Sequence, residues 1–258
     1  MGVDIGGTFT DLVFTNADQH LDKLKVPSTP DDYSRAIVSG IEKYLSQKNI
    51  DGESIDEIVH ATTVATNAIL ERKGARTGLI TTKGFRDVLE LRRIRIPFSY
   101  DLNWQKPAPL VDRFLRCEVD ERVDADGNIS TPLDKSSLQD AIQRLRDASV
   151  TSVAVCLLHS YMNPSHEQDI GEAIRNELPE VYVSLSHEVL PEIKEFERTS
   201  TTVVNAYVAP LIGHYLDELR ENLKRLSVSA PILVMQSNGG LIPSVTASKQ
   251  PVTIIESG

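Results

Sequence analysis

The sequence predicts a mixed α/β protein in which a second α/β unit is inserted into the first. Three short strands are expected at residues 2–5, 10–15 and 20–26, because β-branched and apolar residues gather there between turn residues. A long buried helix is expected at 199–223, where apolar residues recur every three to four positions. The continuous apolar run at 152–158, which lies between two helical patterns, is typical of a buried parallel strand.

Composition excludes several classes of protein. The chain has 258 residues, of which 40% are hydrophobic and 25% charged, as in ordinary globular proteins. A net charge of −10 argues against nucleic acid as a partner and against binding to an anionic membrane. Cys117 and Cys156 lie far apart without a C-x-x-C pattern, so we expect reduced, buried thiols and a cytoplasmic protein.

The order of the elements suggests where the units divide. After the three strands, an amphipathic helix carries apolar residues from Ala36 to Leu45, and a strand, a helix and a further strand at 77–82 follow. We therefore expect a first lobe at 1–83, an inserted α/β unit at 84–185 and the start of a further domain at 186–258.

Both ends of the chain look internal to a longer protein. The chain begins within a predicted strand, with three residues before Asp4. Residues 254–256 are expected to form another apolar strand that leads into a turn at Ser257-Gly258.

The first eleven residues, MGVDIGGTFTD, contain the most informative motif. Gly6 and Gly7 sit between two strands, where they would let backbone N–H groups approach an anion closely. Thr8 and Thr10 add hydroxyl groups. The flanking carboxylates Asp4 and Asp11 could hold a hydrated magnesium ion. The pattern favours a phosphate-binding hairpin, and the alternative is a tight glycine turn between core strands with Asp11 capping it.

This motif differs from the two better-known glycine loops. No lysine follows Gly7 before Lys23, which excludes a P-loop, and the residues after the glycines favour a strand over the helix of a dinucleotide fingerprint. Strand–D-x-G-G-T–strand resembles the first phosphate loop of the actin, sugar kinase and Hsp70 superfamily. That resemblance implies an actin-like ATPase fold with a ribonuclease-H-like lobe, in which the acid holds magnesium through water.

A polar cluster is expected where a strand meets a helix at HATTVATNA, residues 60–68. Thr62 or Thr63 can cap this helix, whose free N–H groups could receive an anion or a carbonyl oxygen. A well-capped helix with Asn67 facing solvent is an equally good interpretation.

The loop QSNGG at 236–240 follows a predicted strand at 232–235. Asn238, Gly239 and Gly240 offer a side-chain amide and accessible backbone. Ligands of open α/β sheets sit at the carboxyl ends of strands, which favours a ligand contact over a plain turn.

Two histidines near the middle of the chain, His159 and His166, bracket an Asn-Pro turn. A zinc site would need a third close ligand and a tighter spacing. Hydrogen-bonded structural histidines are therefore the better interpretation.

Taken together, the motifs resemble the A-type subunit of the hydantoinase/oxoprolinase family along the whole chain. The matching segments are VDIGGTFTDLV (3–13), HATTVATNAILERKGARTGLITTKGFRDVLELRR (60–93), VDERVDADG (119–127), VAVCLLHSYMNP (153–164), SHEVLPEIKEFERTSTTVVNAYVAP (186–210) and MQSNGG (235–240). The resemblance assigns 186–258 to the truncated start of the family's main domain.

The resemblance implies ATP-dependent hydrolysis of a cyclic amide, in which phosphorylation of the carbonyl oxygen precedes ring opening. It implies ATP and Mg²⁺ as cofactors, a B-type partner subunit or fused domain, and an oligomer at full length. By the motif, Asp4 and Asp11 would be catalytic and Asp4 would hold magnesium. Nucleotide contacts would come from Gly6, Gly7, Thr8, Thr10, Asn238, Gly239 and Gly240, and weaker substrate contacts from Thr62, Thr63 and Asn67.

Two alternatives stay open at this point. One is the corresponding subunit of an ATP-dependent ketone carboxylase acting on acetone or acetophenone, which no residue quoted above separates from the hydrolase. The other is a non-catalytic nucleotide-binding module. Because the chain would lack part of the nucleotide site, it is expected to be inactive by itself.

Overall fold

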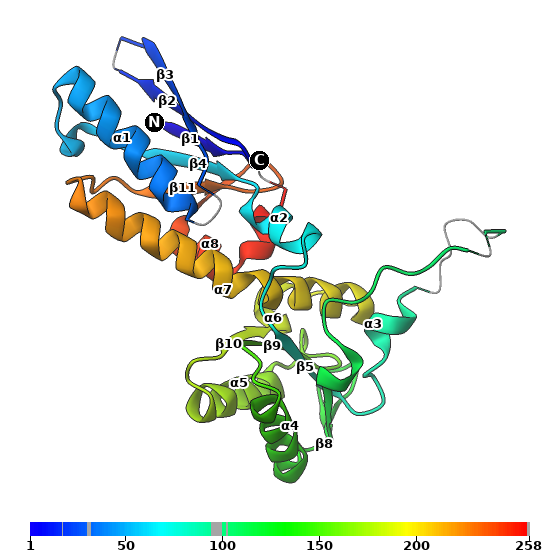
Figure 1. Cartoon of the computed structure of the whole chain (residues 1–258). Helices are drawn as coiled ribbons and strands as arrows, with labels where there is room; N and C mark the ends of the chain where they lie inside the picture. Colours follow the sequence, from blue (N-terminus) through cyan, green and yellow to red (C-terminus); the bar gives the residue numbers. More distant parts are fainter. Residues whose placement is uncertain (17, 30–31, 94–99, 102, 257–258) are drawn as a thin grey trace. The chain divides into compact units, whose positions relative to one another are not determined.

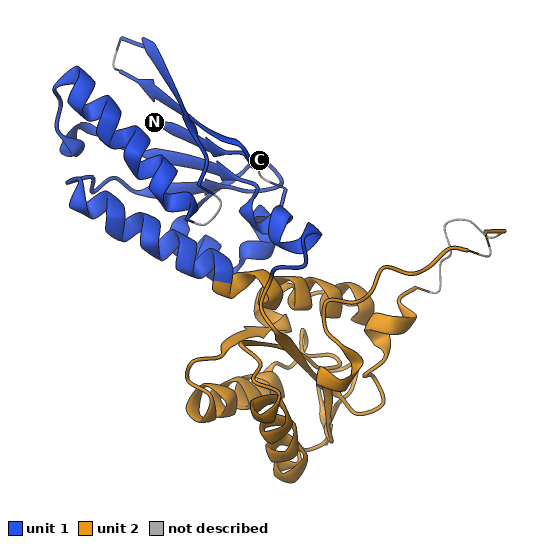
Figure 2. Ribbon diagram, viewed as in Figure 1, with its two compact units in different colours: residues 1–73, 211–258 blue, residues 74–210 orange. Residues whose placement is uncertain are grey.

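The computed structural model describes residues 1–16, 18–29, 32–93, 100–101 and 103–256, which form two compact units (Figure 2). Unit 1 consists of residues 1–73 and 211–258, and unit 2 of residues 74–210. Unit 2 is thus inserted into unit 1. The predicted tail residues Ser257 and Gly258 lie outside the described part of the chain.

The boundaries of the inserted unit differ from the expected positions at residues 83 and 185. The strand at 77–82 belongs to unit 2, because it pairs with strands of that unit on both sides. At the other end, the long helix contributes its first half to unit 2, where Ser152 Oγ donates to the carbonyl of Ala206 at 2.6 Å. Strand pairing and helix packing therefore extend the insertion to residue 210.

Unit 1 is built on a six-stranded sheet with the order β12-β11-β4-β1-β2-β3 (Figure 1). β1, β4 and β11 run parallel, while β2, β3 and β12 form antiparallel additions at the two sides. The elements of unit 1 are β1 (Gly2–Ile5), β2 (Phe9–Thr15), β3 (Leu21–Pro27), α1 (Tyr33–Lys48), η1 (Gly52–Ser54), β4 (Ile58–Thr62), α2 (Val64–Leu70), β11 (Ile232–Met235), β12 (Leu241–Pro243), α8 (Ser244–Lys249) and η3 (Pro251–Ile254).

One face of this sheet is buried and the other is partly open. Val3 on β1 lies opposite both Leu12 and His60, and all three side chains are buried. Gly40 of α1 packs against Leu12, and Tyr215 of α7 hydrogen-bonds to His60, so both helices cover this face. The alternation of strand side chains leaves Asp4 on the opposite, open face.

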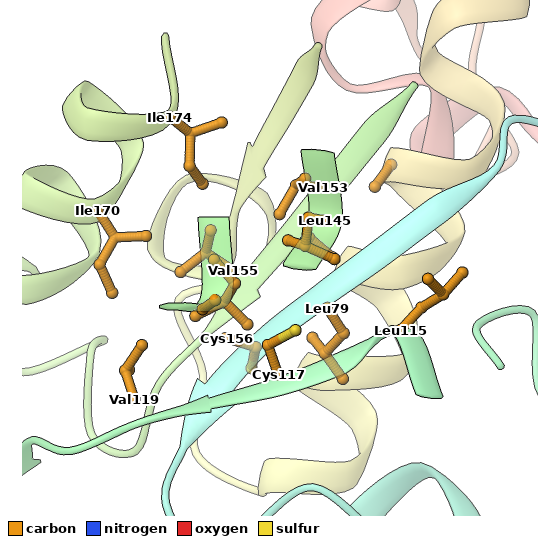
Figure 3. Close-up of a cluster of buried hydrophobic side chains, with 14 of the residues drawn as sticks. Leu79, Leu115, Cys117, Val119, Leu145, Val153, Val155, Cys156, Ile170 and Ile174 are labelled. Carbon is orange, nitrogen blue, oxygen red and sulfur yellow. The ribbon is translucent and has the colours of Figure 1, made fainter. Parts of the chain in front are cut away.

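Unit 2 contains a four-stranded parallel sheet with the order β10-β9-β5-β6 and a small hairpin of β7 and β8. Its core gathers apolar side chains from the strands and from α4 and α5, including Leu145, Val153 and Ile170 (Figure 3). The elements are β5 (Thr77–Thr82), α3 (Val88–Leu91), η2 (Arg113–Leu115), β6 (Arg116–Val119), β7 (Arg122–Val123), β8 (Ile129–Thr131), α4 (Lys135–Asp147), β9 (Ser152–Cys156), α5 (Ser165–Glu177), β10 (Tyr182–Leu185), α6 (Ser186–Val189) and the first half of α7 (Glu195–Arg225).

Two details depart from the sequence-based expectations. The expected strand at 254–256 is wrong, since Pro251–Ile254 form the 3-10 helix η3 and Ile255 and Glu256 lie in a turn. Pro251 starts that helix, because its fixed φ suits a first helical turn. Proline commonly interrupts a helix, but Pro210 lies inside the single helix α7, and the two units divide directly after it. Among the described residues, no helix has the length and apolarity needed to cross a membrane.

Candidate functional site

Three loops of unit 1 meet at one edge of its sheet. β1, β4 and β11 are parallel neighbours, so their carboxyl ends lie at the same edge. Ile5, the last residue of β1, pairs with Thr62, the last residue of β4. The glycine turn after β1, the start of α2 after β4 and the 236–240 loop after β11 therefore come together. The structure thus joins the three segments that the sequence identified separately.

The glycine turn is a closed hairpin between β1 and β2. Ile5 pairs with Thr10 across the hairpin, and the Gly6 N–H donates to the Phe9 carbonyl at 3.0 Å. Gly7 and Thr8 are exposed at the tip. A Cβ added at Gly7 would meet no atom within 4 Å, so the space over this residue is open. An anion can therefore approach the backbone here without displacing protein atoms.

Ser28, at the end of β3, holds the hairpin from the side. Its Oγ donates to the Gly6 carbonyl at 2.8 Å, and its N–H donates to the Thr8 carbonyl at 2.9 Å. The buried Thr10 hydroxyl lies 3.0 Å from Ser28 Oγ, and it is the donor because Ser28 gives its own proton to Gly6. Thr10 is thus a brace of the loop. Sequence reasoning missed Ser28, and its position in an S-T-P turn after a predicted strand gave no signal of this contact.

Two carboxylates flank the turn on the open face of the sheet. Asp4 and Asp11 are paired in register on β1 and β2, and residues opposite each other lie on the same face. Asp4 is exposed, whereas Asp11 accepts a hydrogen bond from Lys25 Nζ at 3.2 Å. Carboxylate oxygens are the ligands that Mg²⁺ prefers, and an exposed acid leaves room for the ion's water shell, so Asp4 fits the role of a magnesium ligand through water.

The junction of β4 and α2 is tied to β1. Thr63 Oγ1 donates to the Ile5 carbonyl at 3.2 Å, and Thr62 Oγ1 accepts from the Val64 N–H at 3.2 Å. The helix-capping bond is therefore made by Thr62, since Thr63 uses its hydroxyl on β1. Asn67 is half-buried and donates to Thr63 Oγ1 at 3.4 Å, which differs from the solvent-facing alternative. α2 is seven residues long and ends at Leu70.

The loop after β11 is a tight turn with an exposed tip. Gln236 N–H donates to the Gly240 carbonyl at 2.7 Å, and Gly240 N–H donates to Asn238 Oδ1 at 2.9 Å. Gly239 has a φ of +87°, a conformation that glycine adopts without strain. Ser237 ties this loop to Thr253 of η3, with its N–H 2.9 Å from the Thr253 carbonyl. One acceptor of Asn238 is thus used inside the loop.

A neutral histidine lies in the core next to the site. His60 on β4 is fully buried, and its Nδ1–H donates to the Val3 carbonyl at 3.4 Å. Its Nε2 lies 2.6 Å from the Tyr215 hydroxyl, which is therefore the donor. Burial lowers the pKa of His60 to about 4, partly opposed by the bond to Val3, and it raises the pKa of Tyr215. The pair is a structural support of β1 and β4.

Two histidines of unit 2 hydrogen-bond to buried carboxylates. His166 Nδ1 donates to the buried carboxylate of Glu121 at 2.8 Å. His187 Nδ1 donates to buried Glu167 at 2.7 Å. Within the described residues, no group of three or more histidine, cysteine or acidic side chains is arranged to hold a metal ion.

Unit 1 with its site defines a class: a mixed α/β protein with a glycine hairpin, two acids and two further loops at the carboxyl edge of a parallel sheet. Family comparison makes the assignment specific. Residues 1–178 match the hydantoinase/oxoprolinase N-terminal region, and residues 198–258 match hydantoinase/oxoprolinase. The chain belongs to the hydantoinase/oxoprolinase family.

Several relatives are similar to this chain in sequence. The chain is 38% identical to the caprolactamase subunit alpha of Pseudomonas jessenii, over 100% of this chain and 38% of that one. It is 33% identical to the acetophenone carboxylase gamma subunit of Aromatoleum aromaticum, over 92% of this chain and 35% of that one. It is 35% identical to 5-oxoprolinase 1 of Arabidopsis thaliana, over 93% of this chain and 21% of that one.

Two solved structures have the same fold. The ATP-dependent caprolactamase of Pseudomonas jessenii superposes with a TM-score of 0.88 at 36% identity, over 98% of this chain and 38% of that one. Acetone carboxylase in its nucleotide-free form gives a TM-score of 0.88 at 28% identity, over 99% of this chain and 38% of that one. The chain thus spans less than two fifths of the length of each of these relatives.

Proposed function

We propose that this chain is the ATP-binding part of an ATP-dependent cyclic amide hydrolase with an actin-like ATPase fold. The observation that carries the proposal is the meeting of the Gly6-Gly7-Thr8 turn with two further loops at one sheet edge. Similarity to caprolactamase and to 5-oxoprolinase supports a cyclic amide as substrate.

In this proposal the hairpin receives the phosphates of ATP. Gly7 and Thr8 present backbone N–H groups and a hydroxyl at an open tip, next to Gly6, whose own N–H closes the turn on Phe9. The buried Thr10 keeps the turn in shape through Ser28. Asp4 would hold Mg²⁺ through water, and Asp11 would add negative charge beside it. Asn238, Gly239 and Gly240 would approach the nucleotide from the next loop.

The chemistry follows from the stability of the amide. Amide resonance makes the carbonyl carbon a poor electrophile. Transfer of the terminal phosphoryl group of ATP to the carbonyl oxygen, with ADP as the leaving group, would weaken this resonance. The residues of this chain would position the phosphates through backbone N–H groups and hydroxyls, and magnesium held at Asp4 would supply the positive charge. Thr63 and Asn67, which are half-buried at the same edge, are the proposed contacts for the substrate or nucleotide. Thr62, also a candidate from the sequence, is fully buried and would act only by holding the start of α2.

The second candidate is a subunit of an ATP-dependent ketone carboxylase. Similarity to the acetophenone carboxylase gamma subunit and to acetone carboxylase favours it. Both reactions begin from an unreactive carbonyl, so the same phosphate site serves either one. A nucleotide-binding module without catalysis is the third candidate.

We also propose a B-type partner subunit or fused domain, because the relatives named above include subunits of larger enzymes. The whole protein would act as an oligomer in the cytoplasm, where the free thiols of Cys117 and Cys156 would stay reduced.

The test is ATP hydrolysis by the whole protein with its partner, measured with 5-oxoproline, a hydantoin or caprolactam, and separately with bicarbonate and acetone or acetophenone. Stimulation by a cyclic amide is expected. Stimulation only by bicarbonate with a ketone would favour the carboxylase, and ATP binding without any turnover would favour the non-catalytic module.

A further inference from the structure

A row of three charged side chains crosses the open face of the unit 1 sheet. Asp4 on β1 pairs in register with Asp11 on β2, and Asp11 pairs with Lys25 on β3. Residues in register on neighbouring strands lie on the same face. The row therefore starts with Asp4 on β1, continues with Asp11 on β2 and ends with Lys25 on β3.

The lysine compensates for an unfavourable arrangement of the acids. Two carboxylates directly opposite each other on adjacent strands repel. Lys25 Nζ lies 3.2 Å from Asp11 Oδ2, so it neutralises the second acid and leaves Asp4 as the unneutralised one. The two side chains are 56% and 50% exposed, and such a pair contributes little to folding stability. Stability alone therefore gives a weak reason for a lysine at this position.

The lysine side chain is directed toward the phosphate turn. Lys25 Nζ lies 5.2 Å from the centroid of the Phe9 ring, as well as beside Asp11. Phe9 directly follows Thr8, the last residue of the exposed tip, and lies two residues from Asp11 toward the turn. The ammonium group is therefore held at the end of β2 that leads to the turn. Both of its neighbours are exposed or half-exposed, so it is free to reorient.

We propose that Lys25 is a nucleotide-positioning residue, whose ammonium group turns from Asp11 to the phosphates when magnesium nucleotide binds. This inference rests on the proposed function. Asp4 would hold the magnesium ion of the nucleotide through water, and the positive charge beside Asp11 would weaken its need for Lys25. The phosphate oxygens would then be the better partner for the Lys25 ammonium group.

The chain offers a matched control for this role. Lys23 lies two residues earlier on β3 and so on the same face, but it stands opposite Val13. Replacing either lysine by methionine removes one positive charge and keeps the length of the side chain. A difference between the two variants therefore reports position and excludes a general effect of net charge.

The experiment measures MgATP affinity by calorimetry and melting temperature for the whole protein and its Lys25→Met, Lys25→Arg and Lys23→Met variants. Losing one charge-assisted contact should weaken MgATP binding about tenfold in Lys25→Met. Lys25→Arg should keep most of the affinity, and Lys23→Met all of it, with all four proteins melting alike. Unchanged binding by Lys25→Met, or equal weakening in both methionine variants, would overturn the role of Lys25. A wild-type protein that binds no MgATP would instead overturn the proposed function, and this inference with it.

Discussion

Ser28 Oγ donates a hydrogen bond to the Gly6 carbonyl at 2.8 Å and so fixes the first residue of the exposed turn from a neighbouring strand. The Ser28 N–H adds a second bond, to Thr8 at 2.9 Å. In the proposed function this turn receives phosphate on its backbone, and a turn whose shape is already fixed loses no conformational entropy on binding. Ser28 would supply that fixed shape through its two hydrogen bonds.

Replacing Ser28 by alanine should therefore weaken the fold slightly and nucleotide binding clearly. The side chain makes two partly buried hydrogen bonds, so the free energy of unfolding should fall by about 1–2 kcal/mol. MgATP affinity should fall as well, because the Gly6 carbonyl is no longer held. Urea unfolding and calorimetry measure both quantities. Ser46→Ala, at an exposed position of α1, is the control. Wild-type MgATP affinity in the Ser28→Ala variant would contradict the role of Ser28 in holding the turn.

Asp4→Asn should lower magnesium-dependent ATP hydrolysis by about two orders of magnitude, because the metal's charge stabilisation is worth several kcal/mol. The fold should be unaffected or slightly more stable, since the substitution removes repulsion from Asp11. Hydrolysis rates across a magnesium titration check this prediction. Asp51→Asn, at an exposed position far along the chain, should behave as the wild type. Full turnover by Asp4→Asn would remove this acid from the mechanism.

Stability should fall in mild acid because of His60. Its pKa is lowered to about 4 in the folded chain, against 6.5 unfolded, so the folded state stays neutral while the unfolded state takes up a proton. The contribution is intact above pH 6.5 and is lost as pH falls from 6.5 to about 4, at about 1.4 kcal/mol per pH unit.

Urea unfolding between pH 4 and 7 measures this effect. His60→Gln should be less stable at pH 7 but should lose less stability on acidification than the wild type. His214→Gln is the control, because the His214 side chain is 73% exposed. An equal slope in wild type and His60→Gln would show that other groups cause the acid sensitivity.

Much of the fold could be predicted because its elements carry local signals. The three opening strands follow from apolar residues bounded by turn residues, and the long helix α7 follows from its apolar repeat. The division into units could not be predicted in the same way. Strand Thr77–Thr82 is buried along its whole length and would suit either sheet, so only its pairing with β6 and β9, both more than 30 residues further along the chain, decides its place.

In the site, too, residues that belong to a local sequence motif could be predicted, whereas residues that act through contacts far along the chain could not. Glycines and acids of the hairpin carry a motif, and the parallel order β1-β4-β11 then brings the predicted Thr62, Thr63 and 236–240 segments to one edge. Ser28 and Lys25 act through contacts 22 and 14 residues away along the chain, to Gly6 and Asp11. A serine or a lysine on a strand has no local feature that marks such a contact.

The most direct test of the central claim, that nucleotide phosphate binds at the hairpin turn, is the MgATP affinity of Gly7→Ala beside Gly2→Ala. A Cβ at either position meets no protein atom within 4 Å, and neither glycine has a positive φ, so both variants should fold and melt as the wild type does. The Gly7 methyl group would occupy the space over the turn, whereas Gly2 lies at the far end of β1. We predict at least tenfold weaker MgATP binding for Gly7→Ala and unchanged binding for Gly2→Ala. Wild-type affinity in Gly7→Ala would contradict phosphate binding at this turn.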